Sequence, residues 1–281
     1  MFGRKASGSV LCPSCGKLVG VQDEACWQCG RRNPGLWGFA PVFQRFGRDL
    51  GFVQIVLWGC SALYLTTLLV DVASIGMSGL SILAPGMQSL FRFGASGALP
   101  LFAYGRWWTI LSAGWLHGSL LHIVLNMMWL RQLAPAAAEL YGASRMIIIY
   151  ISSSAFGFLL TSVAGLFFGA LPILGGAPFT IGASAAIFGL LGALVVYGKR
   201  SGSSHIGGQA WSYAVTLFVF GIIMPRVDNY AHLGGFAGGY LVARWLDPLQ
   251  PERINHMVAA LVLLAMTAFA VLASLLHGQL F

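Results

Sequence analysis

The sequence is poor in charged residues. Only 9% of its 281 residues are Asp, Glu, Lys or Arg, whereas 57% are hydrophobic, and soluble globular proteins carry roughly 25% charge. This composition excludes an ordinary soluble protein and predicts a chain that lies mostly in lipid. The eight acids also largely avoid the apolar segments. Their absence argues against a transporter or channel, because these place ionisable groups along a pathway.

The first 49 residues contain no apolar run long enough for a cleavable signal peptide. They are instead rich in cations, namely Arg4, Lys5, Lys17, Arg31, Arg32, Arg45 and Arg48. We therefore expect this arm to be a soluble extension. The net charge of +8 does not indicate a nucleic-acid partner, because the cations are scattered without a dense basic run or interleaved aromatic residues.

Long apolar runs follow the arm. A helix needs about 20 apolar residues to cross the hydrocarbon core of a bilayer. Seven such runs predict an all-α polytopic membrane protein, with spans at 50–70, 109–131, 144–168, 182–199, 209–225, 230–246 and 256–277. The stretch 71–108 is rich in Gly and Ser and carries Pro85 and Pro100, so it predicts a structured loop.

The cations are unequally divided between the two sides that this topology creates. Thirteen lie with the arm, and only Arg92, Arg106 and Arg226 lie opposite. Cytoplasmic loops carry the excess of Lys and Arg. The count therefore predicts a cytoplasmic N-terminus and a C-terminal tail outside.

Four of the five cysteines form two CxxC pairs in the arm: Cys12 with Cys15, and Cys26 with Cys29. Two such pairs separated by a short loop are typical of zinc ribbons, in which four thiolates surround one Zn²⁺. Two disulfides are the alternative, but a cytoplasmic arm faces a reducing compartment. A closed four-thiolate site predicts a structural metal that folds residues 1–35. Cys60, in the first span, is expected to be a small buried residue.

A nucleophile and a base occur near the starts of two spans. Ser184 lies in Gly182-Ala183-Ser184, and His232 begins the run Ala231-His232-Leu233-Gly234-Gly235. In the predicted topology both fall in the first turn of helices that start from the outer side. They should therefore lie at the same depth, where a hydroxyl and an imidazole suggest acyl-transfer chemistry.

The second span adds three polar side chains that we predict to lie in one helix: His117, His122 and Asn126. His122 and Asn126 are four residues apart and share a face, with His122 somewhat deeper than Ser184. Hydrogen bonding between helices is the simpler interpretation for either residue alone. Metal binding by the two histidines is disfavoured by their spacing of five.

Glycines follow the histidine of the sixth span at a regular interval. Gly235 and Gly239 stand three and seven residues after His232. They form a small-residue stripe on the face of the imidazole that permits a neighbouring helix to approach closely. If the fourth span packs there, Ser184 reaches His232.

These motifs resemble those of the rhomboid intramembrane serine proteases over about 200 residues. Gly182-Ala183-Ser184 resembles the G-x-S motif of the nucleophile, and Ala231-His232 with Gly235 and Gly239 resembles the A-H-x-x-G-x-x-x-G motif of the base. His117, His122 and Asn126 resemble the H-x4-H-x3-N pattern of the second helix. The order of the motifs along the chain is also the family's.

The resemblance implies a six-helix protease core at 50–247, to which a basic linker (36–49), the zinc ribbon and a seventh helix (248–281) are added. It implies a dyad of Ser184 and His232 that cleaves transmembrane protein substrates through an acyl-enzyme. His122, Asn126 and the backbone N–H of Ser184 would form the oxyanion hole. Phe188 would pack against the base. A catalytic role for Asp228, as a third member beside Ser184 and His232, is not favoured.

Two departures from the family pattern stand out. The family's Trp-Arg before the second helix is replaced by Trp108-Thr109, with Arg106 displaced upstream, which weakens any role for Arg106. Ala185 replaces the glycine that often follows the nucleophile, a mild change.

The alternative function is a rhomboid-like pseudoprotease that binds or escorts membrane clients without cutting them. Such a protein should have lost Ser184 or His232, and both are present. The expected setting is a bacterial plasma membrane, with the active site opening outward. The ribbon would be free to meet an unknown cytoplasmic partner.

Overall fold

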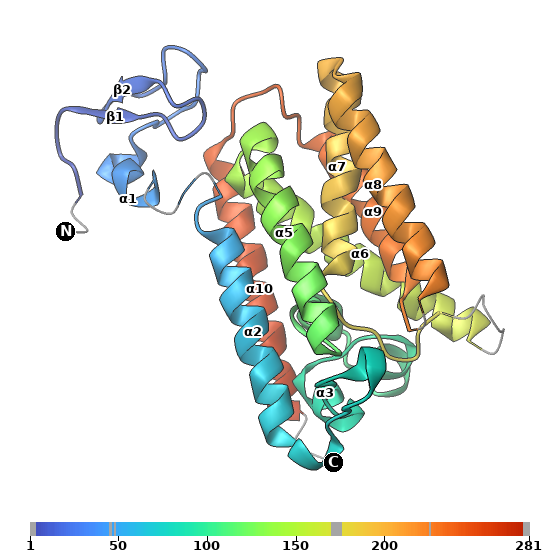
Figure 1. The fold of residues 1–281 in the computed structure, drawn as a ribbon. Helices are drawn as coiled ribbons and strands as arrows, with labels where there is room; N and C mark the ends of the chain where they lie inside the picture. Colours follow the sequence, from blue (N-terminus) through green and yellow to red (C-terminus); the bar gives the residue numbers. More distant parts are fainter. Residues whose placement is uncertain (1–3, 45–46, 48, 170–175, 225, 278–281) are drawn as a thin grey trace.

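The computed structural model describes residues 4–44, 47, 49–169, 176–224 and 226–277. Long helices run side by side, and a small N-terminal unit lies beside one end of them (Figure 1). The helices are α2 (Phe52–Val70), α5 (Leu120–Tyr141), α6 (Ala143–Phe168), α7 (Ser184–Ser201), α8 (Ser204–Ile223), α9 (Asn229–Trp245) and α10 (Ile254–His277). The prediction of an all-helical membrane protein is confirmed.

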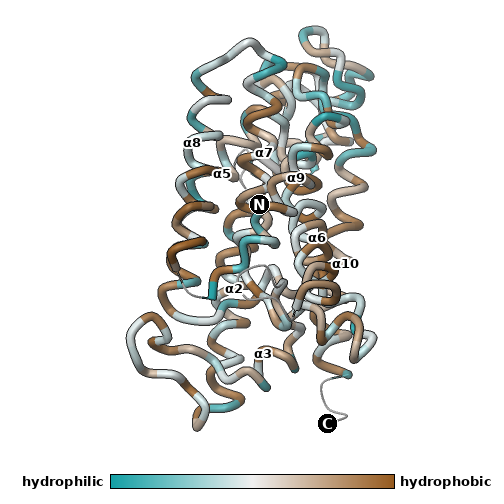
Figure 2. Tube along the Cα trace, turned by 90° about the vertical axis from the view of Figure 1, so that its right-hand side faces the viewer, coloured by the Kyte–Doolittle hydropathy of each residue, from teal (hydrophilic) through white to brown (hydrophobic). Residues whose placement is uncertain are grey.

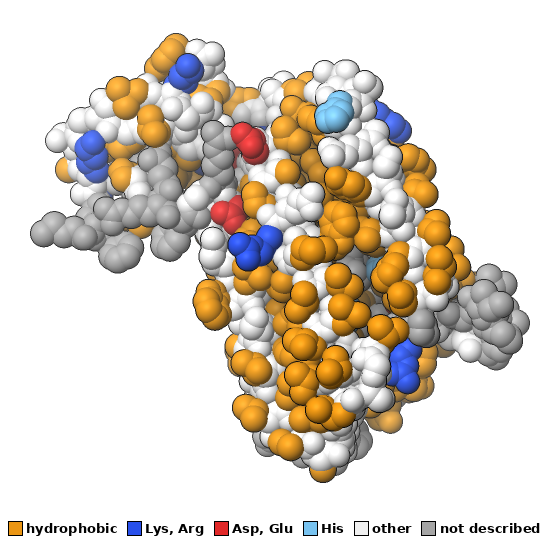
Figure 3. All heavy atoms as spheres, in the orientation of Figure 1, with side chains coloured by type: hydrophobic (Ala, Val, Ile, Leu, Met, Phe, Trp, Pro, Cys, Tyr) orange, Lys and Arg blue, Asp and Glu red, His pale blue; other side chains and the backbone are white. Residues whose placement is uncertain are grey.

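Not every predicted span meets the criteria for crossing a membrane alone. Within the described ranges, α2, α6, α8 and α10 are long and apolar enough. The helical segments Thr109–Trp115 and Leu120–Tyr141, which are bent relative to each other, make a fifth span if they are counted together. Hydrophobic residues are frequent along the long helices (Figure 2), and many hydrophobic side chains lie on the face of the bundle seen in Figure 3. Two of the long helices described above do not meet these criteria: α9 has only 17 residues, and α7 has 18 but carries the charged residues Lys199 and Arg200 in its last turn.

The second span is not one helix, which corrects the prediction for 109–131. A turn of α-helix, α4 (Thr109–Ser112), and a 3₁₀ turn, η5 (Ala113–Trp115), end at Leu116, whose backbone is extended. The chain then bends by 94° before α5 begins. Ser119 caps α5 by accepting from the His122 N–H at 3.2 Å, so the break has a local cause in the sequence. His117 lies in the break and not in the helix.

The loop 71–108 is structured, as predicted, and lies at the end of the bundle away from the N-terminal unit (Figure 1). It contains the helix α3 (Met87–Phe93) and short turns, namely η2 (Val72–Ser74), η3 (Gly79–Ser81) and the π-helical turn η4 (Leu99–Ala103). Ser96 pairs with Thr180 through two backbone hydrogen bonds of 3.0 and 2.8 Å. This pairing ties the loop to the segment that leads into α7.

The N-terminal unit is a small ribbon with a buried apolar cluster of its own, which includes Val10, Val19 and Leu36. Strand β1 (Ser9–Leu11) pairs antiparallel with β2 (Leu18–Gly20). The turn η1 (Leu36–Gly38) and the short helix α1 (Ala40–Gln44) follow. Arg45 and Arg48, two of the cations expected beside the membrane, lie outside the described residues.

Candidate active site and metal centre

Ser184 and His232 are brought together by the close packing of α7 against α9. Ser184 is the first residue of α7, and His232 lies in the first turn of α9. The Ser184 Oγ and His232 Nε2 atoms are 2.9 Å apart. Since a neutral imidazole has one acceptor nitrogen, Nε2 can accept the Ser184 proton while Nδ1 carries the ring's own hydrogen.

The glycines explain why the two helices approach so closely. A methyl group built on Gly235 would stand 2.1 Å from the carbonyl oxygen of Ala185, and one on Gly239 would stand 2.1 Å from that of Gly189. Real side chains never come that near to backbone atoms. Only glycine permits this packing, which sets the separation between Ser184 and His232.

The His232 ring is held on one face by an aromatic side chain. Phe188, one turn after Ser184, stacks on the imidazole with ring centroids 4.3 Å apart and an interplanar angle of 15°. His232 is 7% exposed, and within the described chain its Nδ1 has no hydrogen-bond partner. The ring is thus positioned by packing and by its bond to Ser184.

Asp228 does not contact the His232 ring nitrogen that a third catalytic member would hold. Its Oδ1 accepts from the Ala231 N–H at 3.0 Å and from the Thr161 hydroxyl at 2.9 Å. Asp228 therefore caps α9 and ties it to α6. Because the carboxylate caps the helix, it fixes where α9 begins and therefore where His232 stands along the helix relative to Ser184.

His122 presents a hydrogen-bond donor beside the nucleophile. Its Nδ1 accepts from the Gly118 N–H at 3.2 Å, which leaves the proton on Nε2. A methyl group built on Gly182 would lie 2.7 Å from this Nε2 and 3.9 Å from Ser184 Oγ. Gly182 has φ +122°, a conformation that favours glycine. The donor therefore faces the start of α7.

The prediction that His122 lies deeper than Ser184 along its helix is wrong, because α5 begins only at Leu120. His122, Ser184 and His232 all occupy first turns. Asn126 is buried one turn further along and donates from Nδ2 to the His122 carbonyl at 2.9 Å. His117 packs edge-on against His122 with ring centroids 5.2 Å apart.

The four ribbon cysteines converge as a metal site requires. Their sulfur atoms all lie within 4.8 Å of one another, with 3.7 Å between Cys12 and Cys29 and 3.6 Å between Cys15 and Cys26. Thiolates about 2.3 Å from a tetrahedral zinc ion are about 3.8 Å apart, whereas a disulfide measures about 2.0 Å. The spacing fits a shared cation and not two disulfides. Cys60 is fully buried in the helical core.

Each pair of cysteines is closed by the same backbone turn. Gly16 donates to the Cys12 carbonyl at 2.8 Å and Gly30 to the Cys26 carbonyl at 2.9 Å, and both glycines have positive φ. Burial raises the pKa of the Cys29 thiol to about 12. Burial also acts to raise that of Cys26, but hydrogen bonds from Cys29, Gln28 and Cys15 outweigh it and lower the pKa to about 7. A bound cation would favour the thiolate form of all four.

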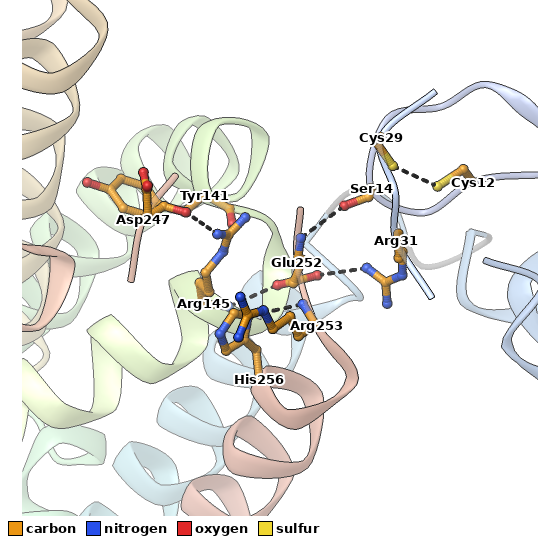
Figure 4. A network of polar contacts seen from close by, with 10 residues as sticks. All are labelled: Cys12, Ser14, Cys29, Arg31, Tyr141, Arg145, Asp247, Glu252, Arg253 and His256. Atoms are coloured by element: carbon orange, nitrogen blue, oxygen red, sulfur yellow. Dashed lines mark hydrogen bonds and ion pairs between the residues drawn. The ribbon is translucent and has the colours of Figure 1, made fainter. Parts of the chain in front are cut away.

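The ribbon contacts the membrane core through a buried acidic residue that the sequence did not single out (Figure 4). Glu252, in the connection between α9 and α10, pairs with Arg31 at 3.3 Å, and both side chains are at most 7% exposed. Its other oxygen accepts from the Arg145 N–H at the start of α6, at 3.0 Å. Its own N–H donates to Ser14 at 3.3 Å. Ser14 and Arg31 adjoin the metal ligands, so the metal site and the docking contact form one unit.

Arg106 is a second residue whose role the sequence underestimated. It is 3% exposed and donates to the carbonyl oxygens of Phe91 at 2.6 Å and Ser274 at 3.2 Å. Its guanidinium also lies over the Phe91 ring, 4.4 Å from the centroid. A lone arginine in an apolar stretch signals a buried partner, and the upstream displacement from Trp108 does not prevent anchoring.

Comparison with known proteins gives consistent matches. Residues 104–248, just over half of the chain, match the family model of the rhomboid domain. The chain is 29% identical to the rhomboid protease GluP of Bacillus subtilis over 194 residues, which are 68% of this chain and 36% of that protein. It is 30% identical to RHOMBOID-like protein 1 of Arabidopsis thaliana over 167 residues, or 57% of this chain and 40% of that one. The chain thus spans well under half the length of these relatives.

Proposed function

The chain belongs to the rhomboid family, and from this we propose that it is an intramembrane serine endopeptidase that cleaves transmembrane protein substrates. The observation that carries the proposal is the 2.9 Å contact between Ser184 Oγ and His232 Nε2. Ser184 is only partly buried. A nucleophile next to its base, at the edge of a membrane bundle, is what peptide hydrolysis in lipid requires.

The first chemical step forms an acyl-enzyme. Ser184 Oγ attacks the carbonyl carbon of the scissile peptide, and His232 Nε2 takes the hydroxyl proton. The tetrahedral intermediate collapses when His232 returns that proton to the departing amine nitrogen. Water then enters, gives its proton to His232 and attacks the ester. Ser184 leaves with the proton, and the second product carries the new carboxyl group.

The oxyanion is stabilised by groups beside Gly182. The Nε2–H of His122 and the backbone N–H of Ser184 supply two donors, and the Asn126 amide supplies a third through the hydrogen that it does not give to the His122 carbonyl. Such donors act on charge that develops only in the transition state, and each is worth on the order of 3 kcal/mol. His117 supports His122 by packing.

The dyad works without a carboxylate in this proposal. Phe188 restricts the imidazole plane, and Asp228 contributes by capping α9. The 18 residues of α7 make about 27 Å of helix, less than the roughly 30 Å of hydrocarbon. Since Lys199 and Arg200 end α7 on the cytoplasmic side, Ser184 falls short of the outer surface, and substrates are cut below it.

The distribution of charge supports the proposed orientation. The ribbon and thirteen of the cations lie on the cytoplasmic side, and the active site opens outward. The proposed location is a bacterial plasma membrane. Substrates are single-span proteins that present their outer boundary to the site. Small or helix-destabilising residues at that boundary would expose the scissile backbone.

The metal held by the ribbon is proposed to be Zn²⁺. Four thiolates leave no open coordination position, so the ion is structural and takes no part in hydrolysis. Cys12, Cys15, Cys26 and Cys29 would hold it.

A rhomboid-like pseudoprotease is the alternative, and one assay separates the two. Protein reconstituted in liposomes with a single-span substrate should generate two fragments. The Ser184→Ala variant should bind the substrate and leave it intact. A pseudoprotease would bind the substrate equally in both forms and cut in neither.

A further inference from the structure

The seventh helix, α10, lies outside the matched residues 104–248 and has no part in the chemistry above. Its last turn nevertheless carries a fully buried hydroxyl, Ser274. The Ser274 Oγ donates to the Ala270 carbonyl at 2.9 Å and accepts from Trp108 Nε1 at 3.0 Å. It also lies 3.5 Å from the hydroxyl of Ser112. The main-chain oxygen of Ser274 accepts from Arg106.

These contacts gather the ends of two helices around one buried cation. Phe91 lies near the end of α3, and Ser274 lies in the last turn of α10. Carbonyl groups at helix C-termini lack partners within the helix and carry partial negative charge. Arg106 is compensated by these carbonyls and by no ion pair within the described residues. Moving α10 would remove part of that compensation.

Hydrogen bonds connect the residues around Ser274 with the segment that leads to Ser184. Ser112 donates to the Gly94 carbonyl at 2.9 Å, and Thr109 lies 3.3 Å from the Ser96 hydroxyl. Ser96 pairs with Thr180 through the backbone. Gly182 donates to the Ala113 carbonyl at 3.0 Å, next to Ser112. The segment that places Ser184 is therefore bonded on its loop side to residues that α10 holds.

Buried Ser and Thr hydroxyls often donate to a backbone carbonyl one turn earlier in their own helix, and such a bond alone does not indicate a function. Thr267 is such a case, because its Oγ1 donates to the Leu264 carbonyl at 2.8 Å within the same helix. Ser274 differs because it also accepts from Trp108 and touches Ser112. Gly94 is packed against both serines, since a methyl group there would lie 2.3 Å from the Ser112 hydroxyl and 2.5 Å from that of Ser274.

We propose that Ser274 is a positioning residue through which α10 holds residues 94–113, and thereby the segment 177–182, in the arrangement that sets Ser184 against His122 and His232. The proposal rests on the proposed serine protease function. It gives the added seventh helix a role in the rate of acylation rather than in substrate binding.

The test compares Ser274→Ala and Trp108→Phe with Thr267→Val as the matched control. Acylation of Ser184 by a fluorophosphonate probe in detergent should slow about tenfold in the first two variants. The double variant should be no slower than either one, because both lose the same hydrogen bond. For a peptide substrate kcat should fall while KM stays constant. Thr267→Val should react like the wild type.

Hydrogen exchange supplies a readout that does not depend on catalysis. The amides of Ala177 and of 179–182 should exchange faster in Ser274→Ala, with α7 and α9 unchanged. Equal acylation and exchange in Ser274→Ala and wild type would overturn the proposal, as would equal slowing by Thr267→Val. If the wild type does not label at Ser184, the protease function fails, and the exchange experiment still decides whether α10 positions this segment.

Discussion

At the scale of single residues, the tautomer of His122 determines what it can do. Because Gly118 donates to Nδ1, the neutral ring must carry its hydrogen on Nε2, next to Gly182 and Ser184. The break in the chain before α5 creates this bond, since it leaves the Gly118 N–H free of any helix. The local backbone therefore turns a histidine into a fixed donor.

We expect His122→Ala to lower kcat about 10²- to 10³-fold with little change in KM, because the lost donor acts mainly in the transition state. Steady-state cleavage of a peptide substrate in detergent measures both constants. His205→Ala is the control, since His205 lies in the first turn of α8, just after α7 ends, whereas Ser184 begins α7 at its other end. An unchanged kcat in His122→Ala would remove His122 from the oxyanion hole.

The sequence pointed to residues that stand in recognisable motifs and missed those with distant partners. Ser184 and His232 were proposed because each lies near the start of an apolar span, and Phe188 because of the resemblance to the family. Arg106 was discounted, since its partners stand 15 and 168 residues away and no periodicity connects them. Glu252 pairs with Arg31 across 221 residues and gave no signal for the same reason.

At the scale of helices, the packing of α7 against α9 depends on glycine at fixed positions. Gly189 and Gly239 meet backbone to backbone, as do Ala185 and Gly235. Gly208, on α8, has open space beside it. The two environments allow the same substitution to be tested where it should matter and where it should not.

Gly239→Ala should destabilise the protein by about 1–3 kcal/mol, because the added methyl collides with the Gly189 carbonyl, and should slow cleavage by moving His232 from Ser184. Gly208→Ala should be neutral or stabilise by up to about 1 kcal/mol, since alanine favours helix. Thermal unfolding in detergent compares them. Equal melting temperatures for the two variants would contradict the packing described.

Helix positions were predictable from the apolar runs, but the break at His117 was not. Hydropathy averaged over about 20 residues does not detect a break at Gly118 and Ser119, although Ser119 is a typical N-cap residue. Pro135 lies inside α5, whose continuation to Tyr141 was also missed because Arg131 was taken as the end of the apolar run. Capping chemistry decides such boundaries, and hydropathy does not record it.

At the scale of the whole molecule, the ribbon and the membrane core are joined at a buried ion pair (Figure 4). Ser14 follows the first metal ligand by two residues, and Arg31 follows the last by two. Folding of the ribbon around a metal therefore sets the positions of both docking groups. The sequence suggested an unknown cytoplasmic partner for the ribbon, and the structure shows that the ribbon also contacts the helical core of its own chain. The domain limits at 35, 49 and 247 remain predictions.

Chelation under reducing conditions should release the ribbon, because the metal supplies most of its folding energy. The purified chain should contain about one zinc per molecule, and residues 4–44 should be cut faster by an added protease once the metal is removed. Glu252→Gln should keep the metal but increase this cutting, since it leaves Arg31 buried without compensation, at a cost of about 3–5 kcal/mol.

Glu24→Gln is the matched control, because Glu24 is exposed on the ribbon and carries the same charge. It should leave both metal content and cutting unchanged. A ribbon that stays protected after the metal is gone would show that the contacts with Glu252 do not depend on metal.

The central claim, that Ser184 is the nucleophile of an intramembrane protease, is tested most directly by proteolysis in liposomes. Wild-type protein and Ser184→Ala are reconstituted at equal density with one single-span substrate, and the fragments are identified by mass. The account predicts one cut near the outer membrane boundary and a rate at least about 10⁴-fold lower in the variant. Equal cutting by both proteins would contradict it.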